Sequence, residues 1–126
     1  MEDLDLILKE AEKELDVFSQ QAQKVTDSIT KVEKLLRDKK IGFELDVRVH
    51  EEENEDGSKI YYHFLWNKIK ESRRIVVRIY HDKQLLKQDH LGQLSLSLRK
   101  KLVAYLPVFI DEIVFEAQER FKKDLQ

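Results

Sequence analysis

The sequence predicts an α+β fold in which a long helix, three antiparallel strands and a second long helix follow one another. Three patterns support this prediction. Apolar residues recur at helical spacing over residues 1–40, they alternate with polar residues over 43–81, and helical spacing returns over 91–124. At 126 residues, we expect the chain to form a single domain spanning residues 1–126.

The first predicted helix carries the most regular pattern of the chain. From Leu4 to Leu36, its apolar residues are separated by alternating steps of four and three residues. A mean period of about 3.5 residues is typical of a coiled-coil seam. We assign this seam to Leu8, Leu15, Phe18, Val25, Ile29, Val32 and Leu36. Two lysines followed by Gly42 predict that the helix ends near residue 40.

The residues that flank the seam lack the opposite charges that align two identical helices. We therefore favour packing of the seam against helices of the same chain, or in a small bundle, over a two-stranded zipper. A helix of 40 residues is nevertheless about 50 Å or more in length, whereas a strand of this sheet spans only about 25 Å. The overhanging seam needs cover from the C-terminal helix, running antiparallel, or from a second copy, so we expect a homodimer.

Alternating apolar and polar residues over 43–50 predict the first strand, with Glu44, Asp46, Arg48 and His50 on the polar face. Residues 51–58 contain no apolar side chain and are expected to form a solvated acidic loop. Two aromatic and β-branched runs, over 59–67 and 73–81, complete a meander. A weaker pattern over 84–87 allows a short fourth strand.

The C-terminal helix is predicted over residues 91–124, with Asp89 as a candidate cap. Pro107 lies inside this range. Because a proline in a helix interior loses a hydrogen bond and clashes with the preceding turn, we expect a kink or the start of a new helical segment there. Trp66 alternates with other aromatic residues and is expected to lie in the sheet core.

The charge is distributed unevenly along the chain. The whole chain has 23 basic and 25 acidic residues, a net charge of −2, but residues 41–58 carry −6 and residues 59–101 carry +8. In a meander, the acidic loop and the basic turn that follows the second strand lie at opposite ends of the sheet. Such charged tips are most often only solvated; the functional alternative is that the basic end meets phosphates or an acidic partner.

The polar face of the sheet holds the candidate binding residues for nucleic acid or an acidic partner. Aromatic rings can stack on bases, and basic side chains can bind phosphates. Histidine, arginine, tyrosine and carboxylate side chains on one sheet also suit metal-free cleavage of RNA. The candidates are Arg48, Tyr61, His63, Lys68, Lys70, Arg73, Arg74, Arg78 and Tyr80. The ordinary alternative is that these side chains provide solubility and cross-strand pairing.

Several classes of function lack a sequence signal. Cysteine is absent, the four histidines show no metal-ligand spacing, and the three glycines cannot build a phosphate-binding loop. No catalytic residue, metal or cofactor is therefore expected. No apolar run is long enough to cross a membrane, and the first residues are acidic, so we expect a cytoplasmic protein without membrane contact.

These patterns favour a non-catalytic interaction module of the adaptor, chaperone or inhibitor type. It would oligomerise through its long helices and present a charged sheet face to a partner protein. The alternative is a nucleic-acid-binding protein, with metal-free ribonuclease activity as an extension. The order of helices and strands is also that of double-stranded RNA-binding domains. The likeness is one of topology only, because both helices are much longer here.

Overall fold

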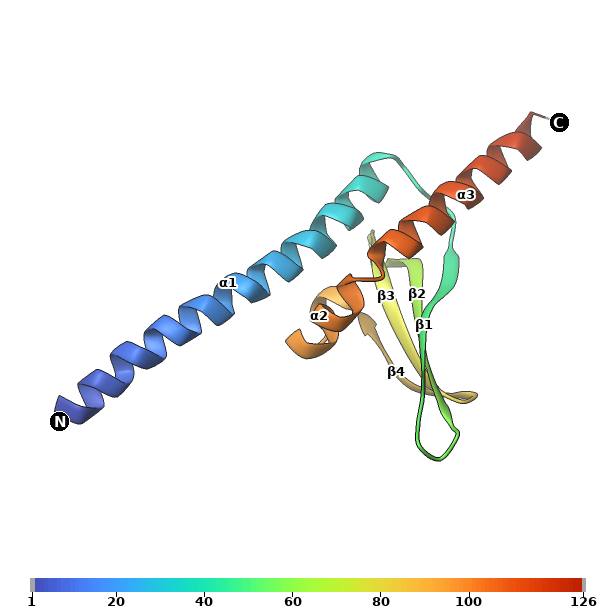
Figure 1. Cartoon of the computed structure of the whole chain (residues 1–126). Coiled ribbons are helices and arrows are strands. Elements are labelled where there is room, and N and C mark those ends of the chain that lie inside the picture. Colours follow the sequence, from blue (N-terminus) through green and yellow to red (C-terminus); the bar gives the residue numbers. More distant parts are fainter. Residues whose placement is uncertain (1, 126) are drawn as a thin grey trace.

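The computed structural model describes residues 2–125 and has the α+β architecture that the sequence predicts (Figure 1). A long N-terminal helix is followed by a sheet and then by two helices on the same face as the first. The elements are α1 (Glu2–Asp38), β1 (Leu45–Glu53), β2 (Lys59–Ile69), β3 (Ser72–His81), β4 (Gln84–His90), the 3-10 turn η1 (Leu91–Gln93), α2 (Leu96–Val103) and α3 (Leu106–Asp124).

The four strands form an antiparallel meander in the order β1-β2-β3-β4. Trp66 in β2 pairs with Leu45 in β1 and with Ile75 in β3, which places all three on the face that the helices cover. Trp66 is fully buried, as expected, and its indole N–H donates to the carbonyl of Ile41 at 2.9 Å. The core lies between this inner face, the second half of α1, η1, α2 and the start of α3.

Strand β1 differs from its prediction in three ways, of which the first is that it begins at Leu45 instead of residue 43. It continues through Glu53, because Glu51–Glu53 pair with Lys59–Tyr61 of β2 instead of forming a loop. The register also shifts between Arg48 and His50, which marks a β-bulge. The extra residue moves His50 from the polar face, where simple alternation placed it, to the inner face, where it pairs with Tyr62.

Helix α1 ends at the predicted place but through an unexpected residue. The N–H of Ile41 donates to the carbonyl of Leu36 at 3.0 Å, and that of Lys40 donates to Arg37 at 2.9 Å. These two bonds form a Schellman motif, whose left-handed residue is usually glycine. Here Lys40 holds that conformation, with φ of 57°, and Gly42 lies two residues further on.

The C-terminal helical region begins later than predicted and is divided. Residues before Leu96 complete β4 and η1, and the cap is Ser95, not Asp89; its hydroxyl accepts the N–H of Leu98. α2 then ends at Val103, and α3 begins at Leu106. Pro107 lies in the first turn of α3, where its missing N–H costs no helical hydrogen bond, so it starts a new segment.

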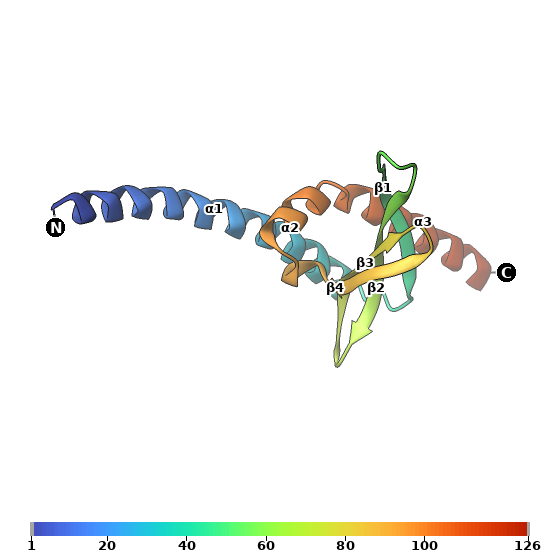
Figure 2. The same ribbon diagram turned by 90° about the horizontal axis from the view of Figure 1, so that it is seen from below.

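Helix α1 extends far beyond the rest of the chain. Both views show its N-terminal half projecting away from the sheet, α2 and α3, with the start of α1 and the end of α3 at opposite extremes (Figures 1 and 2). α3 does not run back along this overhang. Within residues 2–125, no helix combines the length and apolar character needed to cross a bilayer.

Candidate functional site

The overhanging part of α1, residues 3–22, is called the arm below. Its apolar band is largely uncovered: five large side chains are 51 to 63% exposed, namely Leu4, Ile7, Leu8, Leu15 and Phe18. Ala11 and Ala22 complete the band at the same helical spacing. Because nothing else in the described chain packs on this stripe, the arm offers a continuous apolar surface about 20 residues long.

The second half of the predicted seam is filled within the chain. Ile29 and Leu36 are buried in the core, with Val25 and Val32 half-buried beside them. Polar contacts hold this half in place. The Arg99 guanidinium of α2 donates to Thr26 Oγ1 at 2.7 Å, and the backbone N–H of Ile75 donates to the carboxylate of Glu33 at 2.8 Å. The structure therefore divides the seam into a free half and a filled half.

The charge of α1 divides at the same place. The arm carries two basic and six acidic residues, a net charge of −4, whereas residues 23–38, the rest of α1, carry four basic and three acidic residues, a net charge of +1, and Lys39 and Lys40 follow directly. Within the arm, the acidic residues Asp5, Glu12 and Glu14 border the apolar band. The free half of the seam is thus acidic, whereas the filled half is nearly neutral and is followed by two lysines.

The polar face of the sheet brings several candidate binding residues together. His63 Nδ1 lies 2.8 Å from the carboxylate of Asp46, and its ring meets Tyr80 edge-on with centroids 5.0 Å apart. The Arg48 guanidinium lies 4.0 Å from the centre of the Tyr61 ring. Cation–π contacts of this kind fix the position of both side chains.

Arg78 joins the same face but is already engaged. Its Nε donates to Gln88 at 2.9 Å, and its Nη1 lies 3.8 Å from Asp46. The Asp46 carboxylate thus places a negative charge among the cations of this face and offsets part of their attraction for phosphate.

The remaining candidates lie at the hairpin between β2 and β3. Lys68 pairs with Arg73, and Arg74 pairs with Asn67 on the opposite face. Arg73 has a structural role, because its guanidinium donates to the carbonyl of Gly42 at 2.6 Å. Lys70 holds a positive φ of 57° in the turn. Lys68, Lys70 and Arg74 therefore form a basic tip, separate from the contacts that His63 makes with Asp46 and Tyr80.

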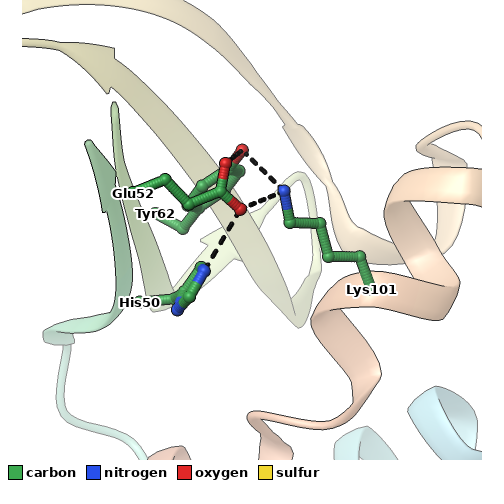
Figure 3. A network of polar contacts seen from close by, with 4 residues as sticks. All are labelled: His50, Glu52, Tyr62 and Lys101. Carbon is green, nitrogen blue, oxygen red and sulfur yellow. Dashed lines mark hydrogen bonds and ion pairs between the residues drawn. The ribbon is translucent and has the colours of Figure 1, made fainter. Parts of the chain in front are cut away.

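A second polar cluster lies on the inner face and was missed by the sequence analysis (Figure 3). The carboxylate of Glu52 pairs with Lys101 of α2 and lies 3.1 Å from His50 Nε2. Lys101 also donates to the hydroxyl of Tyr62 at 3.2 Å, and the His50 ring stacks on Tyr105 at 4.7 Å. The bulge in β1 creates this cluster by turning His50 and Glu52 toward α2.

The charges of this inner cluster stabilise one another. The hydrogen bond from Lys101 lowers the pKa of Glu52 below its ordinary value of 4.5, and the same bond raises the pKa of Lys101 above 10.5. Both groups are therefore fully charged near neutral pH. A general acid or base works best with a pKa near the operating pH, and the pKa values of Glu52 and Lys101 are shifted away from neutrality. The ion pair is therefore better suited to holding α2 against the sheet than to proton transfer.

Among residues 2–125, no three histidine, aspartate or glutamate side chains gather in an arrangement that could hold a metal ion. Comparison of the chain with protein-family models, with curated proteins and with solved structures finds no match.

Proposed function

We propose that this chain is a non-catalytic interaction module that self-associates through its arm and presents the charged residues of its sheet to a partner protein. The observation that supports this proposal is the continuous apolar band of the arm, which the chain's own sheet and helices leave uncovered. Monomeric proteins rarely expose an ordered apolar stripe of this length, and such stripes usually mark interaction surfaces.

The energetics of the arm favour association. Burying the exposed half of one large apolar side chain contributes about 1 kcal/mol, so the five exposed side chains together represent roughly 5 kcal/mol per arm. An isolated helix of about 20 residues is only marginally stable in water. Packing of the band against another surface therefore stabilises both the contact and the helix that makes it.

The charges at the two ends of the sheet support a role in binding a partner. The acidic tip, at the β1–β2 hairpin, and the basic tip, at the β2–β3 hairpin, lie at opposite ends of the sheet. Charges of opposite sign at two fixed positions set the orientation in which a partner docks and raise the rate of encounter. Within the inner cluster, Glu52 and Lys101 neutralise each other.

Sedimentation velocity on the full chain tests the proposal. We expect a particle of twice the 15.1 kDa chain mass at micromolar concentration. The variant Leu8→Glu/Leu15→Glu places two charges in the band and is expected to sediment as a monomer. Val17→Glu is the matched control, because Val17 is 56% exposed on α1 but lies outside the band. A wild-type chain that remains monomeric at 100 µM, roughly the range of weak interfaces, would refute self-association.

Nucleic-acid binding is a second candidate, which the proximity of Arg48, Tyr61, His63 and Arg78 on one open sheet face favours. Asp46 and the bonds already made by Arg78 weaken it. We expect Arg74→Glu/Arg78→Glu to abolish any salt-sensitive binding of a fluorescent single-stranded oligonucleotide while leaving the dimer intact. A wild-type chain that shows no such binding at low salt rules this candidate out, and with it the ribonuclease extension.

A further inference from the structure

We propose that the arm of one copy docks into an apolar groove between α1 and α3 of a second copy. This inference rests on the self-association proposed above and names the surface that receives the arm. The groove has a volume of about 630 Å³ and lies between the C-terminal end of α1 and the part of α3 from Ile110 to Lys122. Eight of its eleven lining residues are apolar.

The groove has the dimensions of a helix-binding surface. Its wall on α3 runs from Ile110 to Phe121, about 16 Å of helix, and the band of the arm from Leu8 to Phe18 covers about 15 Å. Leu35, Val114 and Phe121 are 46 to 63% exposed along it, so apolar surface is available for contact. An amphipathic helix commonly binds by laying its apolar face in such a groove.

The charges of the two surfaces are complementary. Among the described residues that line the groove, only Lys39 and Lys122 are charged, one from each wall, and Lys122 also pairs with Glu119 of α3 at 3.4 Å. The charged residues that border the band of the arm at Asp5, Glu12 and Glu14 are all acidic. Docking therefore places acidic side chains beside lysines, whereas parallel pairing of two arms would bring together two segments that each carry a net charge of −4.

An arm that fills the groove has to come from a second copy. The arm and one wall of the groove belong to the same uninterrupted helix, Glu2–Asp38, and Phe18 lies about 25 Å along that helix from Leu35. The arm cannot bend back into its own groove without breaking α1. Two copies with antiparallel α1 helices can exchange arms, so that each acidic arm lies beside the C-terminal end of the other α1, where Lys39 and Lys40 follow, and the two equivalent contacts close a dimer.

Complementation between two full-length variants tests the inference. The arm variant is Leu8→Glu/Leu15→Glu, and the groove variant is Val114→Glu/Phe121→Glu. Each alone is expected to weaken dimerisation by about 100-fold or more. Mixed together they should form a heterodimer, because the intact arm of the groove variant fits the intact groove of the arm variant. Phe115→Glu is the matched control, since Phe115 is 58% exposed on α3 but does not line the groove.

The outcomes separate this inference from the proposed function. If the arm variant is monomeric while the groove variant stays dimeric, the arm docks on another surface: self-association stands and the groove is not its site. If each variant is monomeric and the mixture also stays monomeric, exchange of arms is refuted. If the arm variant still dimerises, the proposed function itself fails. Circular dichroism checks that each variant retains its helices.

Discussion

The two halves of α1 carry the same alternating spacing of apolar residues but have opposite fates. In residues 23–38 the seam packs on the sheet, η1 and α2, with Ile29 almost fully buried. In the arm, the same pattern is more than half exposed at every large side chain. A 3.5-residue period therefore specifies an apolar surface that is stabilised by burial, and the surface that buries it can belong to the same chain or to another one.

The largest effect is expected from truncating the seam in the filled half. Ile29→Ala should lower the free energy of unfolding by about 3 kcal/mol, because it removes buried methyl groups and leaves a cavity. Leu15→Ala, in the arm, should cost less than about 0.5 kcal/mol when the chain is dilute enough to be monomeric. Urea denaturation at submicromolar concentration measures both. Equal losses at the two positions would contradict the division of the seam.

The buried carboxylate of Glu33 provides a second test of the difference between the filled half of α1 and the arm. It accepts a hydrogen bond from the backbone N–H of Ile75. Ile75 immediately precedes Val76, the first residue of β3 that pairs with β4. Glu33→Ala should cost about 2 kcal/mol, because it leaves a buried donor without an acceptor. Glu33→Gln keeps a carbonyl oxygen and should recover most of the loss, and Glu12→Ala in the arm should be nearly neutral. A loss as large for the glutamine variant would show that charge matters more than the hydrogen bond.

The pair of Glu52 and Lys101 is expected to contribute less, because each side chain is over one third exposed. The lowered pKa of Glu52 means that its contribution is present above pH 4.5 and is lost as pH falls through the lowered value. The raised pKa of Lys101 means that its contribution is present below pH 10.5 and is lost as pH rises through the raised value. Glu52→Gln should therefore destabilise the chain by up to about 1 kcal/mol at pH 7 and by less at pH 3.

Denaturation at the two pH values compares the variant with the wild type. Asp56 also has a lowered pKa, because Ser58 donates to it, but it titrates equally in both proteins and cancels in the difference. A difference that is the same at pH 7 and pH 3 would show that the ion pair does not hold α2 to the sheet.

The smallest effect is expected at the end of the filled half. Lys40 adopts a left-handed conformation that costs a residue with a β-carbon about 1 kcal/mol relative to glycine. Lys40→Gly should therefore stabilise the chain by about 0.5 kcal/mol, while Lys39→Gly, at a residue without positive φ, should destabilise it. Thermal unfolding of the two variants measures the difference. A decrease in stability for both would mean that the lysine side chain contributes more than the backbone strain.

The polar face of the sheet was largely predictable from β1, β2 and β3. Alternation placed Asp46, His63 and Arg78 on one face, and the register confirms that they meet. The same rule failed at His50, because a bulge depends on how β1 pairs with β2 and leaves no mark in the sequence of β1 alone. The inner cluster of His50, Glu52 and Lys101 therefore lay beyond sequence analysis.

Spacing along the chain was enough to predict the order and type of the main helices and strands and the charge of each segment, because these patterns are properties of neighbouring residues. Three features are visible only in the tertiary structure. It shows which half of the α1 seam is covered, that Pro107 begins a separate helix, and that a groove opens between α1 and α3. Burial depends on which surfaces meet once distant segments fold together. A one-dimensional period does not contain that information, so the exposed arm and its candidate groove emerge only in three dimensions.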